Sequence, residues 1–295
     1  MASDVETLFE ELRPLMFSIA YRMVGSVSEA EDIVQEAFLR FHRSFSDGEA
    51  ESPKAVLSTI TTRLAIDHLR SARVRRERYF GTWLPEPLVT NAEPDVAEHA
   101  ETADSLSMAF LVLLESLSPV ERAVFLLHEV FDYGYDEVAS MIGRSEDNCR
   151  QIAVRARRQV EARKPRFETS RDRRDELARR FFAAAEHGDT EELVSMLADD
   201  VVAYADGGGK AQAFPKPVHG RDRVGRLLGR LTERGGVAYV RWRQAEINRQ
   251  PGAIFFDRNG AAVLIVTIDV ADELVQGIRA ITNPDKLRHL APEPR

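Results

Sequence analysis

The sequence predicts a multidomain protein in which two all-α parts precede one α+β domain. A chain of 295 residues with 44% hydrophobic residues is long enough for roughly two cores. Apolar residues recur at helical spacing up to residue 164, whereas strand-like runs appear only after Pro165. Residues 1–164 hold 19 bases and 28 acids, against 21 and 20 in residues 165–295. We therefore divide the chain into helical parts at 1–80 and 101–164, a Pro-containing linker at 81–100, and an α+β domain at 165–295.

Composition excludes several classes of protein. No apolar run approaches the roughly 18 residues of a membrane span, and the acidic start of the chain is unlike a signal peptide. The single cysteine, Cys149, forms neither an internal disulfide nor a multi-cysteine zinc site, and we expect it to be a packing residue. The net charge of -8 argues against nonspecific coating of nucleic acid. We expect a cytoplasmic protein without membrane, metal or cofactor.

The first part reads as three helices. Apolar residues at steps of three and four between Val5 and Gly25 predict the first, which the glycine ends. Ser28 followed by Glu31 has the spacing of a capping box and predicts the start of a second helix ending near Arg43. Pro53 begins a third helix, whose C-terminal half is rich in arginine.

The second helical part ends in a short helix, a tight turn and a longer basic helix. Apolar residues from Val138 to Ile142 are followed by Gly143-Arg144-Ser145, and the apolar spacing then resumes from Ile152 to Val160. This is the layout of a helix-turn-helix, whose second helix enters a DNA major groove. Ser145 is its predicted N-cap. Charge alone leaves DNA binding and a solvated helix face equally open.

The last part mixes helices and strands. Apolar spacing predicts helices around residues 177–184, 193–197 and 224–231. Strand-like runs lie at residues 201–205, 237–242, 253–256, 261–268 and 274–281. Together they predict an α+β domain.

Five signatures in order resemble one family. The run from Ala30 to Arg40, AEDIVQEAFLR, resembles region 2 of extracytoplasmic-function (ECF) sigma factors, and Tyr135 to Arg158 resembles their region 4. The runs WLPEP from Trp83, DGGGK from Asp206 and NPDKL from Asn283 are similar to motifs of the sigma-J-like subgroup, which carries a SnoaL-like, NTF2-like cone domain. The resemblance implies an alternative sigma factor that directs promoter-specific transcription initiation without covalent chemistry.

The resemblance also implies sites on the helical parts. The second helix would bind the clamp region of RNA polymerase core through Asp32, Ile33, Val34, Gln35, Glu36, Phe38 and Leu39. The third helix would read the minus-ten element, where arginines suit phosphates and unpaired bases, through Arg63, His68, Arg70, Ser71, Arg73, Arg75 and Arg76. The helix-turn-helix would bind the minus-thirty-five element through Ser145, Glu146, Asn148, Arg150, Gln151, Arg155, Arg157 and Arg158.

The α+β domain has two interpretations. Because some relatives of its fold are enzymes, Asp206, Lys210, His187 and His219 are candidate acid–base residues of an isomerase or cyclase with a helical DNA-binding arm. We favour regulation of the sigma parts in cis, without a separate anti-sigma protein, while an unidentified small ligand stays open. The regulatory residues would be Trp83, Leu84, Pro85, Asp206, Gly207, Gly208, Gly209, Lys210, Asn283, Pro284, Asp285, Lys286 and Leu287. A one-component repressor, a third class, would bind its promoter tightly without polymerase.

Overall fold

The computed structural model describes residues 2–44, 52–76, 79–90, 105–162, 170–234, 241–290 and 292. Its contacts group the chain into two compact units. The first comprises residues 1–77, 99–106 and 110–164, and the second comprises residues 78–98, 107–109 and 165–295. The four-part division made from the sequence stays a prediction.

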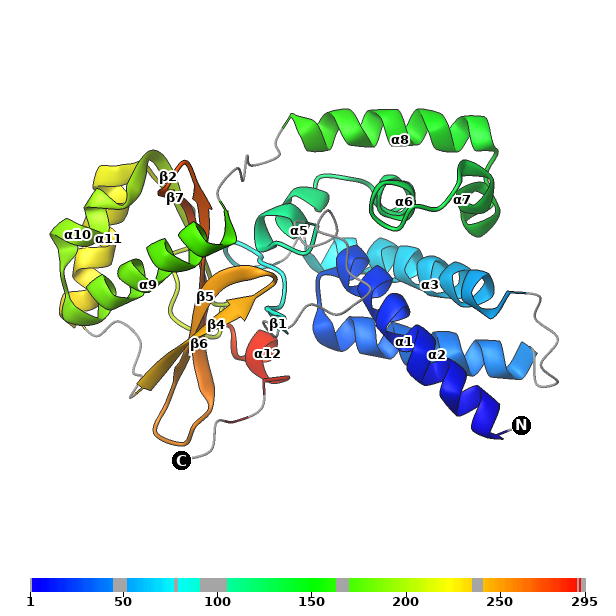
Figure 1. Ribbon diagram of the computed structural model, residues 1–295, viewed down its shortest axis with the longest axis horizontal. Helices are drawn as coiled ribbons and strands as arrows, with labels where there is room; N and C mark the ends of the chain where they lie inside the picture. The colour runs from blue at the N-terminus through cyan, green and yellow to red at the C-terminus, as the bar shows by residue number, and fades with distance from the viewer. Residues whose placement is uncertain are drawn as a thin grey trace. The chain divides into compact units, whose positions relative to one another are not determined.

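The described elements of the first unit are all helices (Figure 1). Its elements are α1 (Ala2–Val24), α2 (Val27–Ser44), α3 (Pro53–Arg76), α5 (Met108–Leu114), α6 (Pro119–Phe125), a π-helical turn η1 (Leu126–Val130), α7 (Tyr135–Ile142) and α8 (Glu146–Glu161). Helices α1, α2 and α3 pack on one another, as their apolar stripes predict. None of the described helices is long and apolar enough to cross a membrane.

The start of α2 corrects one expectation. The helix begins at Val27, and the Oγ of Ser26 accepts the backbone N–H of Glu29 at 3.2 Å. The cap at Ser28 predicted from the sequence is therefore wrong. Glu31, its supposed partner, instead forms an ion pair with Arg13 of α1 at 2.6 Å. Ser26 and Ser28 are two residues apart, and either could cap the start of this helix. The ion pair between Glu31 and Arg13 agrees with the earlier start, after Ser26.

The second unit is a mixed sheet with its three longer helices on one face (Figure 1). Its strands are β1 (Val89–Thr90), β2 (Leu197–Asp206), β3 (Val218–His219), β4 (Arg241–Ile247), β5 (Gln250–Phe256), β6 (Ala262–Ala271) and β7 (Leu274–Ile281). Their order is β1-β4-β5-β6-β7-β2-β3, and only β2 and β7 pair in parallel among the described strands. The helices are α9 (Arg171–His187), α10 (Thr190–Ser195), α11 (Arg221–Arg234) and a short α12 (Pro284–Leu287).

One face of this sheet forms the core of the unit. Phe181, Leu193 and Val224 of the three longer helices pack on Ile268 and Ile278 of the central strands. Because side chains alternate along a strand, the neighbouring residues of β6 and β7 point to the other face. Polar and charged residues on that other face, such as Asp269 and Arg279, are nevertheless buried. The second face is therefore covered as well.

The structure also bears on two other predictions, the strand at 237–242 and the packing role of Cys149. The strand predicted at 237–242 overlaps β4, Arg241–Ile247, at its last two residues, and residues 237–240 lie outside the described residues. The consecutive exposed residues Arg243 and Gln244 interrupt the apolar pattern of this strand. Cys149 has no exposed surface and packs against Val138 and Ile152, and burial raises the pKa of its thiol.

Candidate functional site

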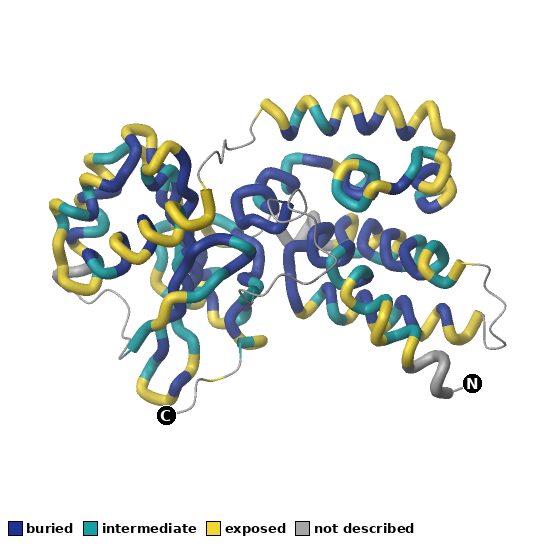
Figure 2. Tube along the Cα trace, viewed as in Figure 1, coloured by how far each residue is buried: buried dark blue, intermediate teal, exposed yellow. Residues whose placement is uncertain are grey.

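The helix-turn-helix predicted from the sequence is confirmed. Helix α7 ends at Gly143, which has φ of 68° in the left-handed region that favours glycine. Ser145 then caps α8, its Oγ accepting the backbone N–H of Asn148 at 3.3 Å. Cys149, Ile152 and Ala156 of α8 are buried in the core, so the opposite face of this helix is exposed (Figure 2).

Two arginines of α8 form ion pairs, and two others are exposed. Arg150 forms ion pairs with Glu146 at 2.9 Å and Asp147 at 3.4 Å, and its guanidinium lies 5.5 Å from the ring centre of Tyr135. Arg157 pairs with Glu129. Arg155 and Arg158 are exposed. The two acids at the start of α8 therefore hold Arg150 in place.

The predicted minus-ten residues lie along α3, and one of them is held by another helix. Arg63 donates from Nε to the carbonyl of Met141 at 2.8 Å and from Nη2 to that of Ser140 at 3.2 Å. Both acceptors lie in the last turn of α7, where the helix dipole attracts a cation. Sequence reasoning missed this contact, since nothing in the sequence pairs a cation of one helix with backbone oxygens of another.

The other residues of the minus-ten prediction have local partners or are undescribed. His68 lies 2.9 Å from the carboxylate of Glu29, Arg70 pairs with Asp67 at 3.2 Å, and Ser71 donates to the carbonyl of His68. The side chains of Arg73, Arg75 and Arg76 lie outside the described residues. DNA contact by this helix stays a prediction.

The predicted polymerase-binding residues on α2 occupy two faces. Ile33, Val34 and Phe38 are buried in the helical core. Asp32, Gln35 and Leu39 are exposed, and Leu39 shows 50% of its surface to solvent. Glu36 lies beside them and pairs with Arg40 at 2.7 Å. The surface that a partner can touch in this conformation is therefore Asp32, Gln35, Glu36 and Leu39.

The three motifs of the α+β part and linker meet at one buried carboxylate. Asp206, at the end of β2, has no exposed surface. Its Oδ1 accepts the phenol of Tyr79 at 2.5 Å and the amide of Gly208 at 3.0 Å. Its Oδ2 accepts the amide of Leu84 at 2.8 Å and the ammonium of Lys286 at 2.7 Å. Four donors from three separated segments thus compensate for burial of this charge.

Lys286 joins the tail of the chain to the linker segment. Its ammonium also donates to the carbonyl of Leu84, and it lies 4.4 Å from the ring centre of Trp83 and 5.0 Å from that of Tyr79. The carboxylate and the two aromatic rings replace the water that this ammonium loses on burial. We call Tyr79, Trp83, Leu84, Asp206, Asn283 and Lys286 the motif cluster.

Asn283 completes the motif cluster. Its Nδ2 donates to the phenol oxygen of Tyr79 at 2.8 Å, while its Oδ1 accepts the amide of Asp285 and so caps α12. Burial, followed by the Asp206 carboxylate, raises the pKa of Tyr79 well above its ordinary value. The phenol is therefore a fixed hydrogen-bond donor at neutral pH.

Neighbouring atoms leave no room for a side chain at glycines of the DGGGK run. A Cβ on Gly207 would lie 2.3 Å from the carbonyl oxygen of Ala211, and one on Gly208 would lie 2.2 Å from Nδ2 of Asn283. Gly208 and Gly209 also have φ of 59° and 70°. The turn they form leads to Lys210, which is exposed and pairs with Asp285. That pair lowers the pKa of Asp285.

Residues 79–90, which we call the strap, continue along the sheet beyond the motif cluster. The carbonyl of Pro87 lies 2.8 Å from Nε2 of His289, and the amide of Leu88 donates to Oδ1 of Asn248 at 2.9 Å. Val89 and Thr90 then pair with β4 as the short strand β1. The sequence analysis did not single out His289 or Asn248, since each acts as one polar group at a loop without a motif of its own.

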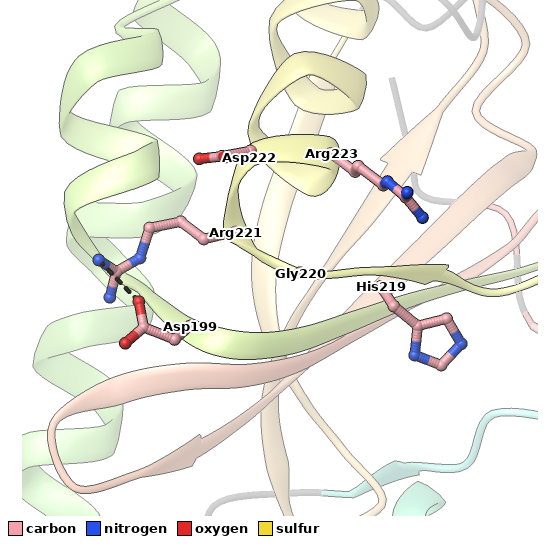
Figure 3. A pocket seen from close by; sticks show the side chains of 6 residues that line it. All are labelled: Asp199, His219, Gly220, Arg221, Asp222 and Arg223. Carbon is pink, nitrogen blue, oxygen red and sulfur yellow. Dashed lines mark ion pairs between the residues drawn. The ribbon is translucent and has the colours of Figure 1, made fainter.

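A pocket of about 350 Å³ lies at the start of α11, lined by Asp199, His219, Gly220, Arg221, Asp222 and Arg223 (Figure 3). Arg221 pairs with Asp199 at 3.1 Å, and the imidazole of His219 points in another direction. The other acid–base candidates have different contacts. Asp206 and Lys210 have the partners described above, and His187 contacts the carbonyl of Ala183. Among the described residues, no hydrogen bond or ion pair joins any two of the four candidates.

Comparisons with known proteins cover nearly the whole chain. Residues 8–75 match Sigma-70 region 2, and residues 107–160 match Sigma-70 region 4. The ECF RNA polymerase sigma factor SigJ of Mycobacterium tuberculosis is 39% identical over 287 residues, covering 94% of this chain and 91% of the relative. The probable ECF RNA polymerase sigma factor SigI of the same species is 32% identical, covering 95% and 94%.

A solved structure extends the similarity to the fold. The crystal structure of Mycobacterium tuberculosis SigJ aligns with a TM-score of 0.76 at 35% identity, covering 97% of this chain and 99% of that chain. The predicted order of two helical sigma parts followed by an α+β domain is confirmed. The chain belongs to the extracytoplasmic-function RNA polymerase sigma factor family.

Proposed function

We propose that this chain is a cytoplasmic alternative sigma factor that brings RNA polymerase core to particular promoters. The exposed side of α2 would bind the clamp region, α3 the minus-ten element and α8 the minus-thirty-five element. The observation that supports promoter recognition best is the exposed basic face of α8, presented by a capped and fully packed helix-turn-helix. We assign no catalytic role to the α+β domain, because no hydrogen bond or ion pair joins its acid–base candidates among the described residues.

Promoter binding would depend on polymerase. The net charge of -8 disfavours DNA binding by the free chain. Two weak DNA-binding parts on one polymerase act at a high effective concentration for their two promoter elements, which raises the affinity without new contacts. Specificity then comes from the pair of elements together.

The α+β domain would regulate the sigma parts in cis, in place of a separate anti-sigma protein. This proposal is carried by the buried Asp206, which binds the strap through Tyr79 and Leu84 and the tail through Lys286. The strap lies in the chain between the regions matched to sigma regions 2 and 4. Holding the strap on the sheet shortens the free chain between those regions, and releasing it lengthens that chain.

Transcription in vitro with RNA polymerase core and a genomic fragment library tests the sigma function. We expect initiation at a defined set of promoters that requires both this chain and core. Tight binding of the chain alone to those promoters, with no transcript in the presence of core, would instead support a one-component repressor.

Truncation tests the regulation. A chain ending at Thr282 lacks Asn283, Lys286 and His289, whereas a control ending at Leu290 keeps all three. We expect the shorter chain and Trp83→Ala to change initiation at the target promoter in the same direction, and the control to match wild type. Regulation through the motif cluster is wrong if all the folded variants transcribe at the wild-type rate.

A further inference from the structure

One apolar side chain stands on the polar face of α8. The buried residues Cys149, Ile152, Ala153, Ala156 and Val160 mark the face of the helix that packs in the core. At 3.6 residues per turn, the opposite face carries a stripe of Asp147, Gln151, Val154 and Arg158. All four are exposed. Val154 shows 44% of its surface to solvent, and the other three are polar or charged.

Folding does not account for a valine at this position. Glutamine, lysine and alanine have higher helix propensities than a β-branched residue, so each would stabilise an exposed position of a helix more than valine does. Only four large hydrophobic residues are exposed among those that the structure describes, namely Leu39, Phe80, Val154 and Leu231. The surface of Val154 is therefore available to be buried by a partner of this helix face.

The surroundings of Val154 fit DNA. Gln151 lies one turn before it and Arg158 one turn after it on the same stripe, and Arg155 is exposed beside it. Arginines pair with phosphates, and glutamine matches an adenine edge. In the major groove, the C5-methyl group of thymine is the apolar group that a base edge presents. An aliphatic side chain between a base-reading amide and phosphate-binding cations therefore matches a groove that contains thymine.

We propose that Val154 is a specificity-determining residue that packs against the C5-methyl of one thymine in the minus-thirty-five element. The inference rests on the proposed function of α8 and adds one base preference and its cause. Removing either the thymine methyl or the valine methyls would remove the same contact. The two losses are therefore expected to be non-additive.

The experiment replaces each thymine of the minus-thirty-five element in turn by deoxyuridine, which keeps base pairing and lacks the methyl. Initiation in vitro is measured with core polymerase and the wild-type chain, Val154→Ala, Val154→Thr or Leu231→Ala. The last variant shortens an aliphatic side chain of similar exposure, 43%, on α11. Thermal unfolding of each variant checks that the helix-turn-helix is intact.

At one position we expect deoxyuridine to lower initiation by wild type about fourfold, the size expected for one buried methyl group. Val154→Ala should be about fourfold weaker on the thymine template and show no further loss with deoxyuridine. Val154→Thr keeps one methyl and should give a smaller deoxyuridine effect, while Leu231→Ala should keep the full effect.

Three results would overturn the inference. One is that every deoxyuridine template is used as well as its thymine counterpart by wild type. The second is an undiminished deoxyuridine effect in Val154→Ala. The third is a loss of initiation in that variant that is independent of every thymine methyl, which would assign Val154 to a protein partner. Absence of any promoter-specific initiation by the wild-type chain would instead contradict the proposed sigma function.

Discussion

Replacing Lys286 by methionine is expected to release the strap from the α+β domain. The ammonium of Lys286 contacts Oδ2 of Asp206 at 2.7 Å, and the two side chains are 9% and 0% exposed. Methionine has similar length and still packs between Tyr79 and Trp83, but it leaves the carboxylate without its cation. Breaking a buried ion pair by removing one partner costs about 3–5 kcal/mol.

The structure favours the lower end of that range. Asp206 keeps three donors in the variant, from Tyr79, Leu84 and Gly208. A loss of about 3 kcal/mol in the free energy of strap opening corresponds to about a 100-fold larger open fraction. Hydrogen exchange of the Leu84 amide reports this fraction directly, because that amide donates to the carboxylate of Asp206.

Lys210→Met is the matched control. Lys210 also pairs with a carboxylate, that of Asp285, but the two side chains are 55% and 36% exposed. An exposed pair of this kind contributes about 0–1 kcal/mol, so exchange at Leu84 should rise less than about fivefold. Equal exchange of the Leu84 amide in the two variants would refute the reasoning. Lys286→Arg, which keeps the charge, distinguishes loss of the ion pair from general unfolding.

Three further predictions concern single features of the chain. Gly208→Ala should destabilise the strap more than Gly209→Ala in hydrogen exchange, because both have positive φ but only a Cβ on Gly208 would meet Asn283, and equal effects would contradict this. Because the pKa of Tyr79 is raised above its ordinary value of 10.0, the folded state keeps its proton while the unfolded chain loses it, so stability falls as pH rises above about 10. Tyr79→Phe should flatten that fall in urea unfolding, and an unchanged slope would contradict it. Asp32→Arg with Glu36→Arg should weaken binding to core polymerase about tenfold, whereas Asp172→Arg with Glu176→Arg, also one turn apart on an exposed helix, should not.

Local patterns predicted the helix-turn-helix well. Its apolar spacing, the glycine that ends α7 and the serine that caps α8 each act within a few residues. Such local patterns predict the element boundaries correctly when the tertiary contacts favour the same boundaries. The start of α2 shows the opposite case. Ser26 and Ser28 are both possible caps in the sequence, and the contact of Glu31 with Arg13 that accompanies the cap at Ser26 forms only in the folded chain.

Long-range polar contacts could not be read from the sequence. The sequence marked Asp206 and Lys286 as members of separate motifs, 80 residues apart, without showing that they are an ion pair. Arg63 appeared as a DNA-binding cation, and the structure gives it carbonyl acceptors 77 and 78 residues away. A charged residue has many chemically suitable partners in a chain, and only the packing of the elements selects one.

The arrangement of donors around Asp206 implies that strap and tail leave the sheet together. The strap supplies Tyr79 and Leu84, and the tail supplies Lys286. Loss of either segment leaves a buried carboxylate short of donors, and that deficit lowers the free energy needed to free the other. Lys286 strengthens this link because it also donates to the carbonyl of Leu84. A small change at one end of the chain is therefore expected to act on the segment between the two sigma regions as an all-or-none release, which is the property a switch in cis requires.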